Sequence, residues 1–407
     1  MCSSDLLDRY ASLYTPVALI LGALLWWWTG DVMRAITVLI VFCPCVMVLV
    51  TPTALVAAVG NAALRGNLIK MGATIEALAR VDTVVFDKTG TLTLGEPWLV
   101  EIVCLDGRSE HELLRLSASA ELFSEHPFGR ATVSAARGRG LQLVDPVEFE
   151  ARPGGGVAAV VNGDAVVLGH AGWLEQRGVA LVPLLDERLK AEGRKGRNAI
   201  PLAINREVSG LLIFEDLLRP AAAETAAKLR SMALQTVLIS GDRKEVARRV
   251  AAEMGIQELY AEVLPEQKAA IVGQLKAKGR RVAFVGDGVN DGPALATADV
   301  GIAMGVTGTD VAIETAQVAL LSDDLSRLPE LIILARKAVQ VIKVNLAFSL
   351  LVLAAAVGLT VAGVLTPVTG ALLHELSSIP VIANSARLLG FRRDAAPGPA
   401  SARHVAG

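Results

Sequence analysis

Polar loops that directly follow short apolar runs hold the residues best suited to chemistry in this sequence. Asp87 follows TVVF, and Asp287 and Asp291 follow RVAFVG. An aspartate can accept a phosphoryl group as a nucleophile, in a reaction that needs positioning, a divalent cation and positive charge more than covalent help. Asp287 and Asp291 offer the carboxylate oxygens that Mg²⁺ prefers, and Lys268, after LPEQ, offers positive charge. One such loop alone is typical of any strand end, but together they predict phosphoryl transfer to Asp87.

A parallel sheet would bring these loops to one edge. The runs TVVFDKTG, TVLISGDR and RVAFVGDGVND each indicate a buried strand that ends in a polar loop, and helical patterns lie between them. This alternation predicts a parallel α/β sheet, whose functional groups gather at the carboxyl ends of its strands. Ser240 and Gly241, in SGD, would add a hydroxyl and an amide donor at that edge. From about Pro97 to Ser209, strand-like runs with glycine turns predict an inserted α+β subdomain.

Four apolar stretches are long enough to cross a bilayer, which takes about 20 residues. Length and the lack of charge in the first three argue against the alternative of buried core helices. Arg65, Lys70 and Lys343 are among the basic residues at the ends next to the large polar region, which the positive-inside rule therefore places in the cytoplasm. The stretches run from about Ala11 to Thr29, Ala35 to Val59, Val341 to Val364 and Pro367 to Leu389.

The composition fits a mixed membrane and soluble protein. The chain has 407 residues, of which 53% are hydrophobic and 20% charged, so two or three domains are expected. A net charge of −2 gives no reason to expect nucleic acid as a partner.

Cys43-Pro44-Cys45 lies in the middle of the second apolar stretch. Proline removes a helical hydrogen bond, and such a break in a membrane is tolerated only inside protein or beside a cavity. Two thiolates at the break would be soft ligands for Cu(I), Zn(II), Cd(II) or Co(II). The alternative is two small apolar side chains beside a kink, and these residues alone leave both readings open.

The motifs DKTGTLT, SGD, LPEQK and GDGVNDGPAL resemble the signature set of the P-type ATPases, whose phosphorylation domain belongs to the haloacid dehalogenase superfamily. The resemblance implies that Asp87 is phosphorylated, that Thr89 contacts the phosphate and that Asp87, Thr89 and Asp287 hold Mg²⁺. Thr89 stands where many members of the superfamily have a general acid/base aspartate, so water would attack the acyl phosphate slowly, as a pump requires. The rest of the implied catalytic set is Lys88, Ser240, Gly241, Asp242, Lys268, Asn290 and Asp291.

The run SEHPFGRA resembles the SEHP motif of the heavy-metal-transporting branch of that family. The branch binds ATP with a glutamate, this histidine and a downstream glycine loop. The implied ATP-binding residues here are Glu121, His126, Gly154, Gly156 and Gly169. His170 stands where the branch often has asparagine, so its role is open.

Within the same resemblance, CPC is the mark of the heavy-metal branch, which makes Cys43 and Cys45 ligands of the transported ion. His374 and Glu375 lie in the fourth apolar stretch, where ionisable residues are functional by default. Imidazole and carboxylate beside two thiolates favour a divalent ion, namely Zn²⁺, Cd²⁺, Co²⁺ or Mn²⁺. A Cu(I) pump is the alternative, and an interhelical hydrogen bond is the alternative role of His374.

The family's actuator domain carries a TGE loop, and no TGE occurs in the sequence. The chain therefore resembles the C-terminal part of a longer pump, as a fragment, a split gene or the product of a misplaced start codon, and a separate chain with the actuator domain is a candidate partner. We expect this chain alone to bind ATP and to phosphorylate Asp87, but not to complete transport. The resemblance also implies a multi-pass protein of the bacterial plasma membrane.

The expected domains follow from these patterns, and two other functions remain open beside the metal pump. One is a membrane-tethered phosphatase of the haloacid dehalogenase type, against which Thr89, SEHP and CPC argue. The other is an inactive metal-binding membrane protein. The expected ranges are 9–60 and 341–389 for two helical hairpins, 80–97 with 209–328 for the phosphorylation domain, 98–208 for the nucleotide-binding domain and 391–407 for a disordered tail.

Overall fold

The computed structural model describes residues 3–152, 154–181, 183–287, 291–304, 314–322 and 324–391. Contacts divide the chain into two compact units. Unit 1 comprises Met1–Thr83, Gly273–Phe284 and Ala294–Gly407, and unit 2 comprises Val84–Val272 and Val285–Pro293.

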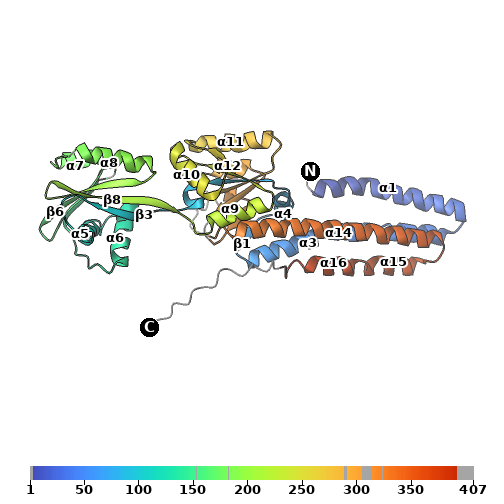
Figure 1. The fold of residues 1–407 in the computed structure, drawn as a ribbon. Coiled ribbons are helices and arrows are strands. Elements are labelled where there is room, and N and C mark those ends of the chain that lie inside the picture. The colour runs from blue at the N-terminus through green and yellow to red at the C-terminus, as the bar shows by residue number, and fades with distance from the viewer. Residues whose placement is uncertain are drawn as a thin grey trace. The chain divides into compact units, whose positions relative to one another are not determined.

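Long apolar helices make up most of unit 1. In Figure 1, α14 runs alongside α3 and α16 in this unit, and all three pairs among these helices are in contact. Side-chain caps fix where two of the helices begin: Asp31 accepts from the amides of Met33 and Arg34 at the start of α2, and Thr366 forms a capping box with Thr369 at the start of α15. The helices are α1 (Ser3–Thr29), α2 (Val32–Val41), α3 (Cys45–Leu64), α14 (Arg327–Val361), α15 (Pro367–Leu376) and α16 (Ser378–Ala386).

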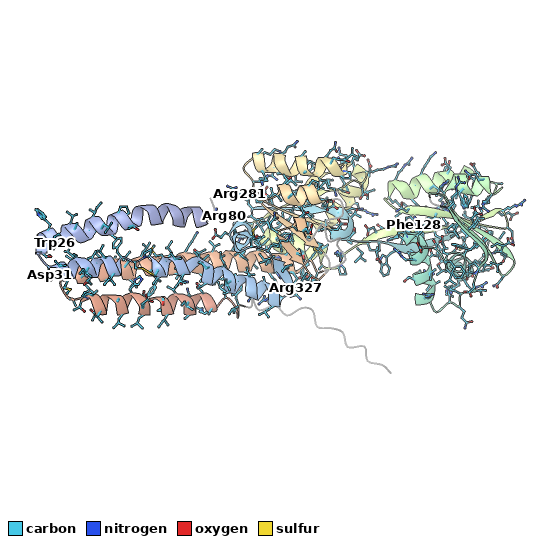
Figure 2. All side chains as sticks on the ribbon, turned by 180° about the vertical axis from the view of Figure 1, so that it is seen from behind. Trp26, Asp31, Arg80, Phe128, Arg281 and Arg327 are labelled. Atoms are coloured by element: carbon cyan, nitrogen blue, oxygen red, sulfur yellow. A yellow bond between two sulfur atoms is a disulfide. The ribbon has the colours of Figure 1, made fainter. Side chains whose placement is uncertain are left out.

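Two of the four stretches predicted as single spans are each two helices. The second is broken at Cys43-Pro44 between α2 and α3, as proline at that point predicts, and the fourth is divided into α15 and α16 at Ser377, which keeps helical backbone angles. By length and composition, Val32–Leu64 and Arg327–Val361 could cross a membrane, with mean hydropathies of 2.5 and 2.2. Figure 2 shows Trp26 and Asp31 near the same end of these helices, where α1 turns into α2.

The described strands form two sheets. The first has seven strands in the order β1-β13-β12-β11-β2-β9-β10, with β2 and β11 each contributing residues to both units. The pairs β12–β13 and β9–β10 are parallel, and β1 joins β13 antiparallel. Its strands are β1 (Asn67–Ile69), β2 (Thr83–Asp87), β9 (Gln235–Ile239), β10 (Glu258–Tyr260), β11 (Val282–Gly286), β12 (Val300–Met304) and β13 (Val318–Leu320).

Strands β2, β9 and β11 are buried along most of their length, as their continuous apolar runs predict. Asp87 is the last residue of β2, while Ser240 and Asp287 come directly after β9 and β11. The helices of this α/β region are α4 (Gly72–Ala79), α9 (Ala222–Ser231), α10 (Lys244–Met254), α11 (Pro265–Ala277) and α12 (Gly292–Thr297).

The second sheet is six-stranded and antiparallel, in the order β3-β8-β7-β6-β5-β4, and lies wholly in unit 2. Figure 1 shows α5 and α6 on one face of it and α7 and α8 on the other. Successive residues of β8 point to opposite faces of the sheet. Leu212 and Phe214 pack into the core under α5 and α6, whereas Leu211 and Ile213 pack into the core on the other face. Its elements are β3 (Thr93–Cys104), α5 (Glu110–Ala120), α6 (Pro127–Gly138), β4 (Val147–Arg152), β5 (Gly156–Val161), β6 (Asp164–Gly169), α7 (Ala171–Gln176), α8 (Pro183–Arg194), β7 (Asn198–Ile204) and β8 (Glu207–Leu218).

The predicted fold class is therefore confirmed: an α/β region carries an inserted α+β part and is accompanied by apolar helices. The domain boundaries drawn from the sequence stay predictions. The predicted disordered tail lies almost wholly outside the described residues.

Candidate phosphoryl-transfer and metal sites

Lys268 joins two buried carboxylates, Asp87 at the end of β2 and Asp291 directly before α12. Its Nζ donates to Asp87 Oδ1 and to Asp291 Oδ1, each at 2.7 Å. All three residues are buried, with 8% of Lys268, 4% of Asp87 and 1% of Asp291 exposed. Buried charges need a partner, and here one cation serves two anions. The sequence-predicted nucleophile, lysine and second acid are thus brought together.

This shared lysine leaves the carboxylates short of positive charge. Burial and then the nearby Asp291 raise the pKa of Asp87 to about 7, against the opposing effect of Lys268. Burial likewise raises the pKa of Asp291, although Lys268 acts to lower it. Burial would lower the pKa of Lys268, but Asp87 and Asp291 together raise it above its usual range. The cluster therefore favours the arrival of a further cation.

The residues present fit a magnesium ion. Asp291 Oδ2 is buried and has no hydrogen-bond partner among the described residues. Asp287 packs so closely on Gly90 that a Cβ at that glycine would lie 2.6 Å from Asp287 Oδ2. Oxygen ligands of this kind suit a hard divalent cation. Asp87 and Asp287 would hold it, with the unpaired oxygen of Asp291 beside them, and it would supply charge neutralisation to a bound phosphate.

The SGD loop binds the residue after Asp87. Lys88 Nζ pairs with Asp242 Oδ2 at 2.6 Å, and the hydroxyl of Ser240 donates to the same oxygen at 3.0 Å. Gly241 lies between Ser240 and Asp242 in the chain. Thr89, in the loop after Lys88, is exposed. Asn290, the remaining predicted member, lies outside the described residues.

Two residues at the end of β8, which the sequence analysis missed, clamp the loop after Asp87. Arg219 donates to Thr91 O at 2.9 Å and to Gly90 O at 3.0 Å. Asp216 Oδ1 accepts from the amide of Gly95 at 3.0 Å, and burial raises the pKa of this carboxyl. The only sequence signal was an acid and an arginine three residues apart at a strand end, a pattern without local specificity.

Glu121, predicted to bind ATP, is a buried acid with an unused oxygen. It is 8% exposed, its Oε2 has no hydrogen-bond partner among the described residues, and burial raises its pKa. It lines a pocket of about 360 Å³ together with Ser124, Arg130 and Arg137. Cationic side chains and an unpaired acid around one pocket suit a polar ligand.

His126 is exposed at the start of α6, where its Nδ1 accepts from the amide of Phe128 at 3.3 Å. The ring of Phe128, labelled in Figure 2, stacks on His126 at 5.3 Å between centroids. Gly156 and Gly169 pair across β5 and β6, and Gly154 lies in the turn before them. Nearby, the ring of Phe123, which follows α5, packs edge-on against that of Phe149 in β4, with centroids 5.9 Å apart.

Cys43, Cys45 and His374 form a second cluster, in unit 1. Their ligand atoms all lie within 4.8 Å of one another. His374 Nε2 is buried without a hydrogen-bond partner among the described residues. Such an imidazole suits a metal ion better than the interhelical hydrogen bond considered from the sequence. Glu375 is exposed and is not part of this cluster.

The sulfur atoms of Cys43 and Cys45 are joined as a disulfide, with their Cα atoms 5.5 Å apart. Only the reduced pair can bind a metal, because thiolates are the ligands. A cavity of about 20 Å³ lies beside the cluster, and its lining includes Ser349, His374 and Ser377.

Comparison with known proteins places this arrangement in a class. A family model described as haloacid dehalogenase-like hydrolase matches residues 81–299, which contain every described residue of the phosphoryl-transfer site. The chain therefore belongs to the haloacid dehalogenase-like hydrolases. Within that class it is a homologue of heavy-metal-exporting P-type ATPases, which confirms the resemblance found in the motifs.

Relatives named for different metals match almost the whole chain. A manganese-exporting P-type ATPase of Mycobacterium tuberculosis is 42% identical over 389 residues, which cover 95% of this chain and 54% of the relative. A probable copper-exporting P-type ATPase V of the same organism is 39% identical, over 96% of this chain and 51% of the relative. The crystal structure of a zinc-transporting PIB-type ATPase in the E2.Pi state is 34% identical, with a TM-score of 0.83, over 94% of this chain and 63% of that one. The chain thus spans about half the length of the curated relatives it matches.

Proposed function

We propose that this chain carries the phosphorylation machinery and a cation-binding part of an ATP-driven exporter of a transition-metal ion. The observation that carries the proposal is the buried cluster in which Lys268 bridges Asp87 and Asp291. An aspartate placed among a lysine and further acids suits attack on the γ-phosphate of ATP, which forms an aspartyl phosphate and releases ADP.

ATP and Mg²⁺ are the cofactors that we propose. Mg²⁺ would be held by Asp87, Thr89 and Asp287, and the nucleotide by the residues predicted from the SEHP resemblance. The pocket beside Glu121, lined by Arg130 and Arg137, supports the second assignment. Lys268 would stabilise the phosphoryl oxygens as negative charge develops on them.

A divalent transition-metal ion is the cargo that we propose. The cluster of Cys43, Cys45 and His374 combines soft thiolates with an imidazole, a set that suits Zn²⁺, Cd²⁺, Co²⁺ or Mn²⁺. Glu375 stays a proposed ligand. Export of Cu(I) is the alternative, since a thiolate pair alone would suit that ion and one relative is named for copper.

The cluster of Cys43, Cys45 and His374 would lie within a multi-pass membrane part, and the phosphoryl-transfer site would lie on the cytoplasmic side. The apolar helices of unit 1 and the family's metal-exporting relatives support this placement.

A separate chain with the actuator domain stays a prediction. A membrane-tethered phosphatase is the second candidate, favoured by the description of the matching family as hydrolases. The exposed threonine at position 89, where that chemistry needs an acid/base, argues against it.

Labelling with [γ-³²P]ATP tests the proposal on the full chain in detergent. We expect an acid-stable, hydroxylamine-sensitive label that Asp87→Asn abolishes. Asp186→Asn is the matched control, because Asp186 is an exposed aspartate that pairs with the exposed Lys190 in α8. A label that survives in Asp87→Asn would refute the assignment. Release of phosphate from small esters without any stable label would favour the phosphatase.

A further inference from the structure

The indole of Trp173, in α7, packs against the glycines assigned to ATP. Trp173 is only 2% exposed. A Cβ at Gly156 or at Gly169 would lie 2.8 Å from its Cδ1 atom, and one at Gly155 would lie 3.2 Å from its Cε3 atom. Carbon atoms pack at about 3.5–4.0 Å, so the indole leaves room for glycine alone at positions 156 and 169.

His170 ties the glycine turn to the same helix. Its amide donates to Gly155 O at 3.1 Å, and its Nδ1 accepts from the amide of Trp173 at 3.0 Å. Gly156 and Gly169 are directly paired across β5 and β6. The backbone around these glycines is therefore set by the position of the Trp173 ring, and His170 acts as a helix cap.

Two guanidinium groups flank the indole. Arg177 Cζ lies 4.4 Å and Arg152 Cζ 5.7 Å from its ring centroid. Arg177 is held by an ion pair with Glu150, and Arg152 donates to Gln176 at 2.9 Å. Positive charge next to a glycine turn attracts an anionic ligand.

The indole N–H is the unexplained feature of this arrangement. Trp173 Nε1 is buried and has no hydrogen-bond partner among the described residues. Buried donors are nearly always paired, so an unpaired donor beside a binding turn points to a constraint other than stability.

We propose that Trp173 is a positioning residue of the nucleotide site. It acts through the backbone of Gly155, Gly156 and Gly169, which it holds in the arrangement that receives ATP, and it does not itself touch the ligand. The proposal rests on nucleotide binding by this part of unit 2, as set out under the proposed function. Because the ring packs on the turn, ATP binding changes the surroundings of the indole and hence its fluorescence.

The test titrates ATP into the full chain in detergent and EDTA, by calorimetry and by tryptophan emission. Trp173→Phe keeps an aromatic ring but leaves a gap under the turn, and we expect it to weaken ATP affinity roughly tenfold. Trp98→Phe is the matched control, because Trp98 is a half-exposed tryptophan of β3 outside this arrangement. The ATP-induced emission change should persist in Trp98→Phe and vanish in Trp173→Phe. Labelling of Asp87 from acetyl phosphate, which has no nucleoside, should be the same in all three proteins.

If Trp173→Phe proves misfolded by circular dichroism, Arg177→Gln takes its place, since it leaves the core intact. We expect this variant to weaken ATP binding roughly two- to fivefold. The proposed role of Trp173 is overturned if the folded variant that is tested, Trp173→Phe or Arg177→Gln, binds ATP within twofold of the unsubstituted chain and shows the same ATP-induced change in emission. Absence of ATP binding in the unsubstituted chain overturns nucleotide binding as well, and is thereby distinguished from failure of this proposal alone.

Discussion

At the scale of single residues, the charge balance around Asp87 decides how the site behaves. One lysine faces two buried carboxylates at 2.7 Å, and Asp287 adds a third carboxylate that raises the pKa of Asp87 further. Buried ions that lack full compensation cost free energy. The metal-free site is therefore under electrostatic strain that Mg²⁺ would relieve, and stability should report this.

Asp87→Asn should make the metal-free chain more stable at alkaline pH. The pKa of Asp87 is about 7 in the folded chain against an ordinary 3.8. A pKa raised on folding gives a stabilising contribution that is present below the unfolded pKa and is lost as pH rises through the folded pKa. In EDTA we expect Asp87→Asn to exceed the unsubstituted chain by about 1–3 kcal/mol at pH 8, and the difference to disappear only as the pH falls to about 4, close to the unfolded pKa.

Urea denaturation followed by circular dichroism measures this difference. Asp186→Asn, at an exposed position, serves as the control and should follow the unsubstituted chain at both pH values. Excess Mg²⁺ should narrow the gap at pH 8. An identical pH dependence in Asp87→Asn and the unsubstituted chain would contradict the explanation.

Lys268→Ala should be destabilising and inactive. The substitution leaves Asp87 and Asp291 buried side by side without their shared cation. Removing one partner of a buried ion pair costs about 3–5 kcal/mol, and this loss should shrink near pH 5, where protonation removes the charge. We expect no label from [γ-³²P]ATP and a lower urea midpoint at pH 8. Lys278→Ala, at an exposed position near the end of the same helical region, should change neither.

Sequence reasoning found Asp87, Lys268 and Asp291 because each lies in a distinctive motif. It missed Asp216 and Arg219, which hold the loop after Asp87, because their partners lie more than a hundred residues away. The sequence pattern also did not predict that the ring of His126 caps the start of α6. Residues that act by supporting others are set by long-range packing, and no local spacing reveals them.

At the scale of elements, the gap between α2 and α3 is what brings Cys43 and Cys45 together. In a continuous helix, residues two apart point to different sides. Here the chain leaves the helix at Cys43 and Pro44 and restarts at Cys45, so that both sulfur atoms face one another. The proline rule predicted this break.

Pro44→Ala should therefore weaken metal binding. Restoring a hydrogen-bond donor at position 44 favours a continuous helix, which would turn one thiolate away from the other. For the reduced chain we expect Zn²⁺ affinity to fall at least roughly tenfold, measured by competition with a chromogenic chelator. Pro52→Ala is the matched control, since Pro52 lies within α3 and away from the break. Equal affinities in Pro44→Ala and the unsubstituted chain would contradict the role of the break.

At the scale of the whole molecule, the two candidate sites belong to different units. The thiolate and imidazole cluster lies in unit 1, and the described phosphoryl-transfer residues lie in unit 2. The sequence predicted both sites and the inserted sheet, because apolar runs, glycine turns and motifs are local signals. It could not give the strand order of the seven-stranded sheet, where neighbours such as β2 and β9 are far apart in the chain.

If the chain is part of an exporter, its two sites must be thermodynamically linked, since a transported ion that left phosphorylation unaffected could not be driven by ATP. We expect the level of label at Asp87 in the reduced chain to change about fivefold or more with one divalent metal of a panel containing Zn²⁺, Mn²⁺, Cd²⁺ and Co²⁺. Cu(I) is included to test the alternative cargo. Combined Cys43→Ser and Cys45→Ser substitutions should remove the metal response and leave ATP affinity unchanged. Cys104→Ser, at the remaining described cysteine, is the control and should keep the response.

His374→Ala separates the proposed cargo classes within the same experiment. The imidazole completes the thiolate pair for a divalent ion, because one of its ring nitrogens lies within 4.8 Å of the sulfur ligands. Loss of a divalent response in this variant, with ATP affinity retained, would support a divalent cargo. A response to Cu(I) that survives the substitution would instead favour the thiolates alone as ligands and a copper cargo. Linkage between the metal cluster and phosphorylation would be contradicted if no metal changed the level of label at Asp87, in the unsubstituted chain or in the cysteine variants.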